Sequence, residues 1–264
     1  MEDLPAAARR AHRRTGRGAG PRSEGGRLFD AGPRRLKSVL VTGAGRGIGH
    51  AAAQRFQDAG FRVLALDKDF SKCRLEKAER VRYDLQDLAG VAALVERLGE
   101  IDVLVNNAGT LYCHPHDRFP EADVLEILNV NLRAPVALIE AVAPQMRRRR
   151  QGRIVNVASV AAFTGHPDLW YGATKAALLN VTKSYAGYLG REGILVNAVA
   201  PGPTLTDMYE QLPQSRKDAV MRAVYSARPC SADEVAQAIF WLGSASPDYL
   251  SGATIDVNNG SYPR

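Results

Sequence analysis

Short apolar runs alternate with longer stretches of helical period from residue 38 onward, and this alternation limits the fold more than any other feature of the sequence. Strands that alternate with helices pair in parallel, because each crossover helix returns the chain to the same end of the sheet. The predicted strands are 38–42, 61–66, 80–83, 101–105, 153–158, 194–199 and 253–257. We therefore expect a single α/β domain built on a doubly wound parallel sheet of about seven strands.

The predicted helices follow the strands or their loops and cover 47–59, 88–98, 121–149, 171–190 and 231–243. Two connections between predicted strands do not fit this alternation of strands and helices. The 12 residues between Asp67 and Arg80 leave room for a very short helix at most. About 30 residues separate Ala200 from Ser231, and loops longer than about 12–15 residues in a compact domain usually bind or cover ligands. We interpret residues 203–229 as a substrate lid.

The excess positive charge is concentrated at the N-terminus. The formal net charge is +7, and residues 1–37 alone hold ten Arg or Lys and four Asp or Glu. Residues 1–36 are rich in Arg, Gly and Pro and lack an apolar period, which predicts a disordered basic tail ahead of a domain over 37–264. A nucleic-acid-binding protein carries its basic excess on the folded domain, so no nucleic-acid partner is expected and a solvated tail is favoured over an RNA-binding arm.

Several other classes are disfavoured by what the sequence lacks. No window offers the roughly 20 apolar residues of a membrane span, and the tail holds no signal-peptide stretch, so we expect a cytoplasmic protein with no membrane partner. Cys73, Cys113 and Cys230 show neither a disulfide nor a metal-ligand pattern. The segment His114-Pro115-His116 lacks a third ligand, and we predict no metal site.

A glycine-rich segment joins the first predicted strand to the first predicted helix. It runs Thr42-Gly43-Ala44-Gly45-Arg46-Gly47-Ile48-Gly49. Glycines in this place permit a tight turn and a close approach of the backbone to a pyrophosphate, while the helix N-terminus offers unpaired N–H groups to the anion. A purely structural turn is the alternative, but the position between strand and helix favours a dinucleotide site.

The second predicted strand is followed by Asp67, 18 residues after Gly49. An acidic side chain there accepts hydrogen bonds from the ribose hydroxyls of NAD and repels the 2′-phosphate of NADP. Arg46 and Lys68 have the opposite preference, because each can attract that phosphate. We give the acid more weight, since it would lie against the ribose itself, and predict NAD, with NADP less favoured.

Three motifs occur in order along the chain: TGxxxGxG at Thr42–Gly49, NNAG at 106–109 and YxxxK at 171–175. Together they resemble the short-chain dehydrogenases/reductases, and the resemblance spans about residues 37–260. It implies a Rossmann fold and an NAD(P)-dependent oxidoreductase acting on a secondary alcohol or ketone. A homotetramer is implied as well.

The resemblance also implies a catalytic set. Tyr171 would exchange a proton with the substrate oxygen while hydride passes to or from the nicotinamide. A free tyrosine has a pKa near 10, and Lys175, four positions later on one helix face, suits the task of favouring the phenolate. Ser159 would hydrogen-bond the substrate oxygen, and Asn131 would hold a water molecule of the proton relay. Without the motifs, a solvent-facing Tyr–Lys pair and a turn serine would be the ordinary interpretations.

By the same resemblance, Asp84 and Leu85 would flank the adenine and Thr206 would meet the nicotinamide carboxamide. The full set of implied cofactor-binding residues is Gly43, Arg46, Gly47, Ile48, Gly49, Asp67, Asp84, Leu85, Asn107, Gly109, Tyr171, Lys175, Pro201, Thr204 and Thr206. Two departures affect the pocket. Ser159 precedes Tyr171 by 12 positions where the family commonly has 13. The segment Val257-Asn258-Asn259-Gly260 stands where many members of the family have an aspartate and paired glycines.

The substrate is left open among three hypotheses. YGATKAAL and PGPTLTDM, with the short segment after Asp67, look like dihydro-dihydroxybenzoate dehydrogenases, which oxidise a cyclic alcohol. A 3-oxoacyl thioester reductase is the alternative, disfavoured by Asp67 if NADPH is required. A non-catalytic dinucleotide sensor or scaffold is the third, and the complete Tyr, Lys, Ser and Asn set argues against it.

Overall fold

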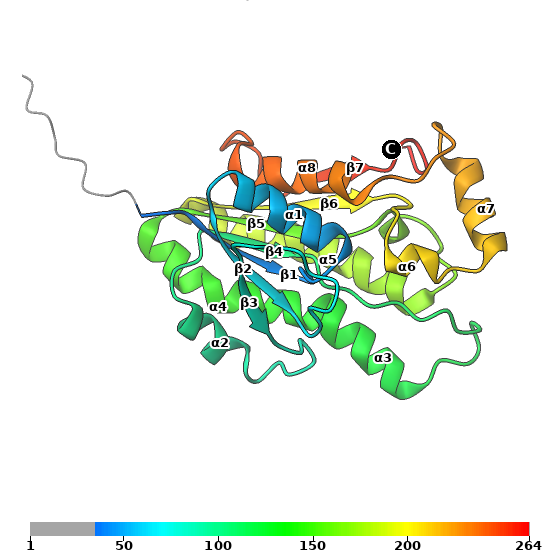
Figure 1. Ribbon diagram of the computed structural model, residues 1–264, viewed down its shortest axis with the longest axis horizontal. Helices are drawn as coiled ribbons and strands as arrows, with labels where there is room; N and C mark the ends of the chain where they lie inside the picture. The colour runs from blue at the N-terminus through cyan, green and yellow to red at the C-terminus, as the bar shows by residue number, and fades with distance from the viewer. Residues whose placement is uncertain (1–34, 264) are drawn as a thin grey trace, which may run out of the picture. The chain divides into compact units, whose positions relative to one another are not determined.

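A computed structural model of the chain describes residues 35–263 (Figure 1). Almost all of the tail predicted for 1–36 lies outside these residues, as does Arg264. Contacts divide the chain into Met1–Arg35 and Leu36–Arg264, and the second unit carries the whole fold described below.

Seven strands form one parallel sheet, as the alternation predicted. They are β1 (Ser38–Thr42), β2 (Arg62–Asp67), β3 (Glu79–Arg82), β4 (Val103–Asn106), β5 (Gly152–Val157), β6 (Ile194–Pro201) and β7 (Thr254–Val257). Their order in the sheet is β3-β2-β1-β4-β5-β6-β7, and every pair is parallel. The chain leaves β1 toward β2 on one side and returns to β4 on the other. The reversal opens a crevice beyond the carboxyl ends of β1 and β4, where doubly wound folds bind ligands.

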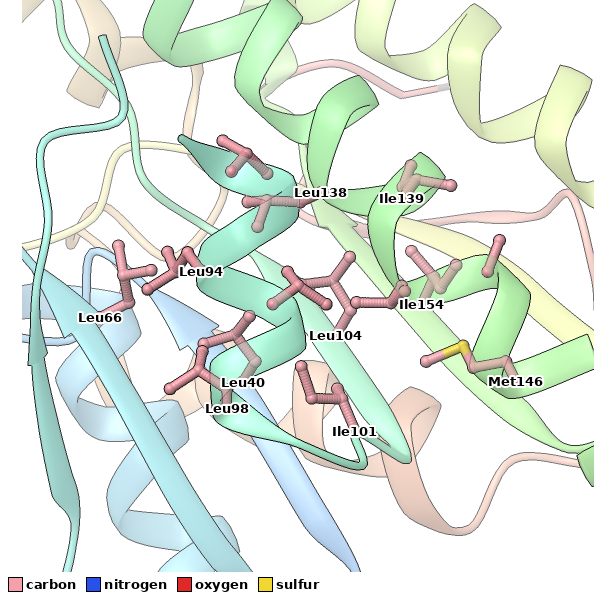
Figure 2. Packing of buried hydrophobic residues seen from close by; sticks show 14 of the residues in the cluster. Leu40, Leu66, Leu94, Leu98, Ile101, Leu104, Leu138, Ile139, Met146 and Ile154 are labelled. Carbon is pink, nitrogen blue, oxygen red and sulfur yellow. The ribbon is translucent and has the colours of Figure 1, made fainter. Parts of the chain in front are cut away.

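Helices cover both faces of the sheet. One face carries α1 (Gly47–Asp58) and α8 (Ala232–Ser244), and the other carries α2 (Val91–Leu98), α4 (Ala134–Arg149) and α5 (Leu169–Leu189) (Figure 1). Alternate residues of each strand face opposite layers: Leu40 and Leu104 pack under α2 and α4 (Figure 2), whereas Val39 and Val103 belong to the cluster under α1 and α8. Burial on both faces explains the apolar runs of the inner strands, whereas the edge strand β3 reads Glu79-Arg80-Val81-Arg82 and buries only Val81.

The single long helix predicted over 121–149 is interrupted. Helix α3 (Glu121–Leu128) passes into a π-helical turn, η1 (Asn129–Arg133), before α4 begins. The turn carries the fully buried Asn131, whose side chain bonds to the backbone of Thr110 in another loop. Such π-bulges are frequent at functional sites.

The predicted lid over 203–229 contains two short helices, α6 (Asp207–Glu210) and α7 (Gln214–Ala223), which lie beyond the carboxyl end of the sheet (Figure 1). Short 3₁₀ turns, η2 (Val160–Ala162) and η3 (Gly190–Glu192), flank α5. The connection from β2 to β3 forms turns rather than a helix. No helix within 35–263 is long and apolar enough to cross a membrane.

Candidate active site

A cavity of about 620 Å³ opens at the carboxyl ends of the strands. Its walls come from the glycine-rich turn, the ends of β2, β4, β5 and β6, the start of α5, and both lid helices. Its volume is that of a site for a sizeable organic ligand. Every catalytic or cofactor-binding residue predicted from the sequence lines this cavity except Gly49 and Asn131.

The glycine-rich turn has the tight backbone that its sequence predicted. Gly43 and Gly47 adopt φ angles of +66° and +59°, which favour glycine. A Cβ on Gly49 would collide with the carbonyl oxygen of Gly43, so this glycine permits α1 to pack closely against the end of β1. Arg46 is the N-cap of α1 and its side chain makes no capping hydrogen bond, which leaves the first N–H groups of the helix available to an anion.

Asn107 and Thr42 hold this turn against the end of β4. The side-chain amide of Asn107 donates to the carbonyl oxygens of Thr42 and Gly43 at 2.9 and 3.3 Å. The buried Thr42 hydroxyl accepts hydrogen bonds from the backbone N–H groups of Asn107 and Ala108, both at 3.0 Å. The turn is therefore positioned by side chains as well as by its own glycines.

The carboxylate of Asp67 faces the glycine-rich turn. Its oxygens accept from the backbone N–H groups of Gly45 at 2.9 Å and Asp69 at 3.0 Å. The two cations expected to compete with it are already paired. Lys68 lies 3.3 Å from Glu126 of α3, and Arg46 lies 3.6 Å from Asp207 of the lid, which also pairs with Lys72 at 2.7 Å.

The remaining predicted cofactor residues line the same cavity. They are Ile48, Asp84, Leu85, Gly109, Pro201, Thr204 and Thr206. Asp84 accepts a hydrogen bond from the backbone of Gln86 at 3.0 Å, and Leu85 is buried beside it. Thr206 caps α6 and lies opposite Gly47 across the turn, since a Cβ on Gly47 would come within 3.3 Å of the Thr206 methyl group.

Tyr171, in the first turn of α5, and Ser159, directly beyond β5, meet at the cavity. Ser159 forms the N-cap of η2, where its hydroxyl accepts from the Ala161 backbone at 3.1 Å, and this fixes its side chain. The pKa of Tyr171 is raised overall, chiefly because the residue is buried. A hydrogen bond with Ser159 and the charge of Arg216 lower this pKa, and the charge of Asp168 raises it further.

Lys175 lies one helical turn after Tyr171, with Nζ 5.7 Å from the centre of the tyrosine ring. The ammonium donates to the carbonyl oxygen of Val157 at 2.7 Å, and the residue is 3% exposed. Burial lowers the pKa of Lys175 to about 8. The group is thus still mainly cationic near neutral pH, as an electrostatic role beside Tyr171 requires.

Asn131 is brought close to this group but is engaged by its own loop. Its side-chain oxygen accepts from the Thr110 backbone at 2.8 Å, and its amide donates to the Thr110 carbonyl at 2.9 Å and to Thr174 at 3.3 Å. A Cβ on Gly109 would lie 3.5 Å from both the Asn131 oxygen and Lys175 Nζ. Asn131 therefore stabilises the loop at Thr110, which lines the cavity, while Asn131 itself does not.

A family model described as short chain dehydrogenase matches residues 37–217. The chain belongs to this family. Short-chain dehydrogenases are NAD(P)-dependent oxidoreductases that act on CH–OH groups, so the protein is an enzyme of that kind.

Similar proteins cover the same part of the chain. A 3-oxoacyl-[acyl-carrier-protein] reductase FabG from Staphylococcus aureus (strain Mu50) is 36% identical over 86% of this chain and 98% of its own. The structure of a 3-oxoacyl-[acyl-carrier protein] reductase from Brucella melitensis with bound NAD has a TM-score of 0.79 and 31% identity, covering 88% of this chain and 93% of its own. The structure of ElxO with NADP bound has a TM-score of 0.78 and 25% identity, covering 86% of this chain and 99% of its own.

The cavity of this short-chain dehydrogenase fits a nicotinamide dinucleotide by its own chemistry. Turn glycines and the free N-terminus of α1 suit a pyrophosphate, Asp67 suits a ribose, and buried Leu85 offers an apolar wall. At the other end, Tyr171 and Ser159 offer a hydroxyl pair to a reacting oxygen. A nicotinamide cofactor is therefore the group this cavity is built for.

The structure of this short-chain dehydrogenase also reveals a charged group that the sequence analysis missed. Asp168, Arg216 and His166 meet beside Tyr171, although Arg216 is 48 residues away from Asp168 along the chain. No periodicity or motif links these positions. The predicted lid was the only available signal, because it contains Arg216.

Proposed function

We propose that this enzyme transfers hydride between NAD and a secondary alcohol or its ketone, with Tyr171 as the proton-transfer residue. The observation that carries the proposal is one continuous cavity, with Asp67 and the glycine-rich turn along one part and Tyr171 with Ser159 along another. This arrangement suits a dinucleotide whose reactive ring lies beside the substrate oxygen.

In the oxidation direction the substrate hydroxyl gives its proton to Tyr171 as its carbon loses hydride, which leaves a ketone. The nicotinamide supplies the hydride acceptor. Ser159 donates a hydrogen bond to the reacting oxygen, and Lys175 supplies positive charge that favours the phenolate before proton transfer. In reduction, the same tyrosine returns the proton.

Asp67 supports NAD as the preferred cofactor, because its carboxylate is held against the turn, while Lys68 pairs with Glu126 and Arg46 shares Asp207 with Lys72. We expect Asp67→Ser to lower kcat/KM for NAD by about tenfold and to raise it for NADP, because the repulsion of the 2′-phosphate is removed. Initial rates at several concentrations of each cofactor measure the ratio. A variant with the wild-type ratio would assign the choice to other residues, and Asp69→Ser, whose carboxylate bonds Ser71 instead, is the matched control.

The substrate we favour is an uncharged alcohol with apolar bulk. The lid side of the cavity is lined by the apolar side chains of Met208, Leu212, Ala219, Val220 and Ala223, together with Tyr209, Gln211 and Arg216. A 3-oxoacyl thioester is the second candidate, favoured by the similarity to the FabG reductases. A reductase of this kind from Brucella melitensis has NAD bound in its structure, which is compatible with the cofactor that Asp67 favours.

An assay of cofactor oxidation and reduction tests the proposal directly. NAD and NADP, in both redox states, are tested against cyclic alcohols, acyclic secondary alcohols and a short 3-oxoacyl thioester. We expect turnover with NAD and at least one secondary alcohol or its ketone. Dinucleotide binding without turnover of any substrate would support the sensor hypothesis instead.

We also propose a homotetramer built on α4 and α5. The outward side of α5 carries Ala173 and Ala176, which are exposed and apolar, and a monomer would present polar residues there. Closed symmetry would let identical patches cover one another. Light scattering at micromolar concentration should give a tetramer for the full chain and for a chain lacking 1–36. A monomer would contradict the proposed tetramer. A tetramer that forms only when residues 1–36 are present would contradict the expectation that this segment does not contribute to assembly.

A further inference from the structure

Asp168 holds a buried negative charge at the start of the helix that carries Tyr171. It is the N-cap residue of α5, yet its side chain makes no capping hydrogen bond. The carboxylate is 3% exposed, and its Oδ2 atom has no well-aligned hydrogen-bond donor. A buried carboxylate is costly without a compensating charge, so the group that supplies that charge matters.

The compensating charge comes from the lid. Arg216 of α7 places a guanidinium nitrogen 2.6 Å from Asp168 Oδ2, and its side chain is 16% exposed. Helix α7 itself buries no residue completely. This ion pair is therefore a main attachment of α7 to the body of the enzyme, and such sparsely buried segments open readily.

His166 joins the pair to the tyrosine. Its Nε2 atom faces the Arg216 guanidinium at 3.0 Å, and its Nδ1 atom lies 3.3 Å from the Asp168 carbonyl oxygen and 3.2 Å from the Asp168 backbone nitrogen. Burial and Arg216 lower the pKa of His166, so the ring is neutral near pH 7. The same ring lies against Tyr171, with 5.4 Å between centroids.

The charged and polar groups around Tyr171 therefore come from four parts of the chain. Ser159 follows β5, Lys175 lies on α5, His166 and Asp168 precede that helix, and Arg216 belongs to the lid. Burial is the largest cause that raises the Tyr171 pKa, and among the charges beside it Asp168 raises the pKa further while Arg216 lowers it. Of these groups, Arg216 alone lies on the lid.

We propose that Arg216 is a positioning residue that couples closure of the lid to proton transfer at Tyr171. With the lid seated, Arg216 neutralises the Asp168 carboxylate and supports His166 against the tyrosine ring. With the lid lifted, the Asp168 carboxylate loses its cationic partner, and His166 loses the contact that holds it against the tyrosine ring. Proton transfer is thereby confined to the closed state, in which the lid covers the substrate. The inference rests on the proton-transfer role proposed for Tyr171.

The test is the pH dependence of kcat for alcohol oxidation in Arg216→Gln, Asp168→Asn and the double variant. Arg216→Gln should move the acidic limb to higher pH and lower kcat near neutrality by about tenfold, because one opposing charge is lost. Asp168→Asn should move the limb to lower pH. The double variant should return it close to the wild-type position, and Arg216→Lys should restore part of the loss.

Lys217→Gln is the matched control, since this neighbouring lysine pairs with Glu210 inside the lid at 2.9 Å. It should leave the limb in place. A role of Arg216 in lid stability alone would lower kcat at every pH without moving the limb, and that result would overturn the inference.

A second measurement needs no substrate. The ionisation of Tyr171 can be followed by NMR of isotope-labelled tyrosine Cζ, with the Tyr171 signal assigned by its absence in Tyr171→Phe. The Tyr171 pKa measured in this way should rise in Arg216→Gln and fall in Asp168→Asn. An active Tyr171→Phe enzyme would refute the proposed function, whereas an essential Tyr171 whose titration ignores both variants would refute only the coupling.

Discussion

Tyr171→Phe should lower kcat by about a thousandfold or more, while the dissociation constant for NAD stays within about threefold of the wild type. The change removes only the hydroxyl that exchanges the proton and keeps the ring that packs against His166. Steady-state rates with saturating substrate measure the first quantity, and calorimetric titration with NAD measures the second.

Tyr188→Phe on the same helix is the control, because Tyr188 is 71% exposed and lies outside the cavity. It should keep wild-type kcat. If Tyr171→Phe retained more than a tenth of the wild-type rate, another group would have to move the proton.

Lys175→Met should lower kcat by about a hundredfold, because the cation beside Tyr171 is lost while the apolar stem of the side chain is kept. The same variant tests the burial of the ammonium through stability. Burial lowers the pKa of Lys175 from 10.5 to about 8, so between these values the folded chain has released a proton that the unfolded chain still holds. The free energy of unfolding should therefore rise with pH in this window by about 3 kcal/mol more in the wild type than in the variant.

Denaturant unfolding at pH 7.5 and at a pH near 10 measures that difference. The comparison must be made between proteins, since other groups also titrate in this range. Lys183→Met, an exposed lysine two turns later on α5, should behave as the wild type does in both stability and kcat. Parallel pH curves for wild type and Lys175→Met would show that Lys175 is not charged differently in the folded and unfolded chains.

Much of the fold could be predicted because its determinants are local. The apolar runs identified seven strands, and the alternation with helices predicted their parallel pairing. The π-helical turn at 129–133 was not predicted, because its side-chain pattern resembles that of a regular helix. It is tied to hydrogen bonds between Asn131 and Thr110, which lie 21 positions apart.

The sequence by itself determined the features that depend on spacing within one element or one turn. Gly43 and Gly47 had to be glycine for the turn between β1 and α1, and Tyr171 and Lys175 share a face because four positions make about one helical turn. Parallel strands then bring such residues to one edge of the sheet, so an ordered set of motifs predicts a single site.

Only the tertiary structure decided which charges meet. Arg216 pairs with Asp168, and Asp207 with both Arg46 and Lys72, although long stretches of chain separate these partners. Charged side chains show no sequence period from which their ion-pair partners could be predicted. Their pairing follows from how the lid and loops settle over the carboxyl end of the sheet, where burial raises the cost of any charge left alone.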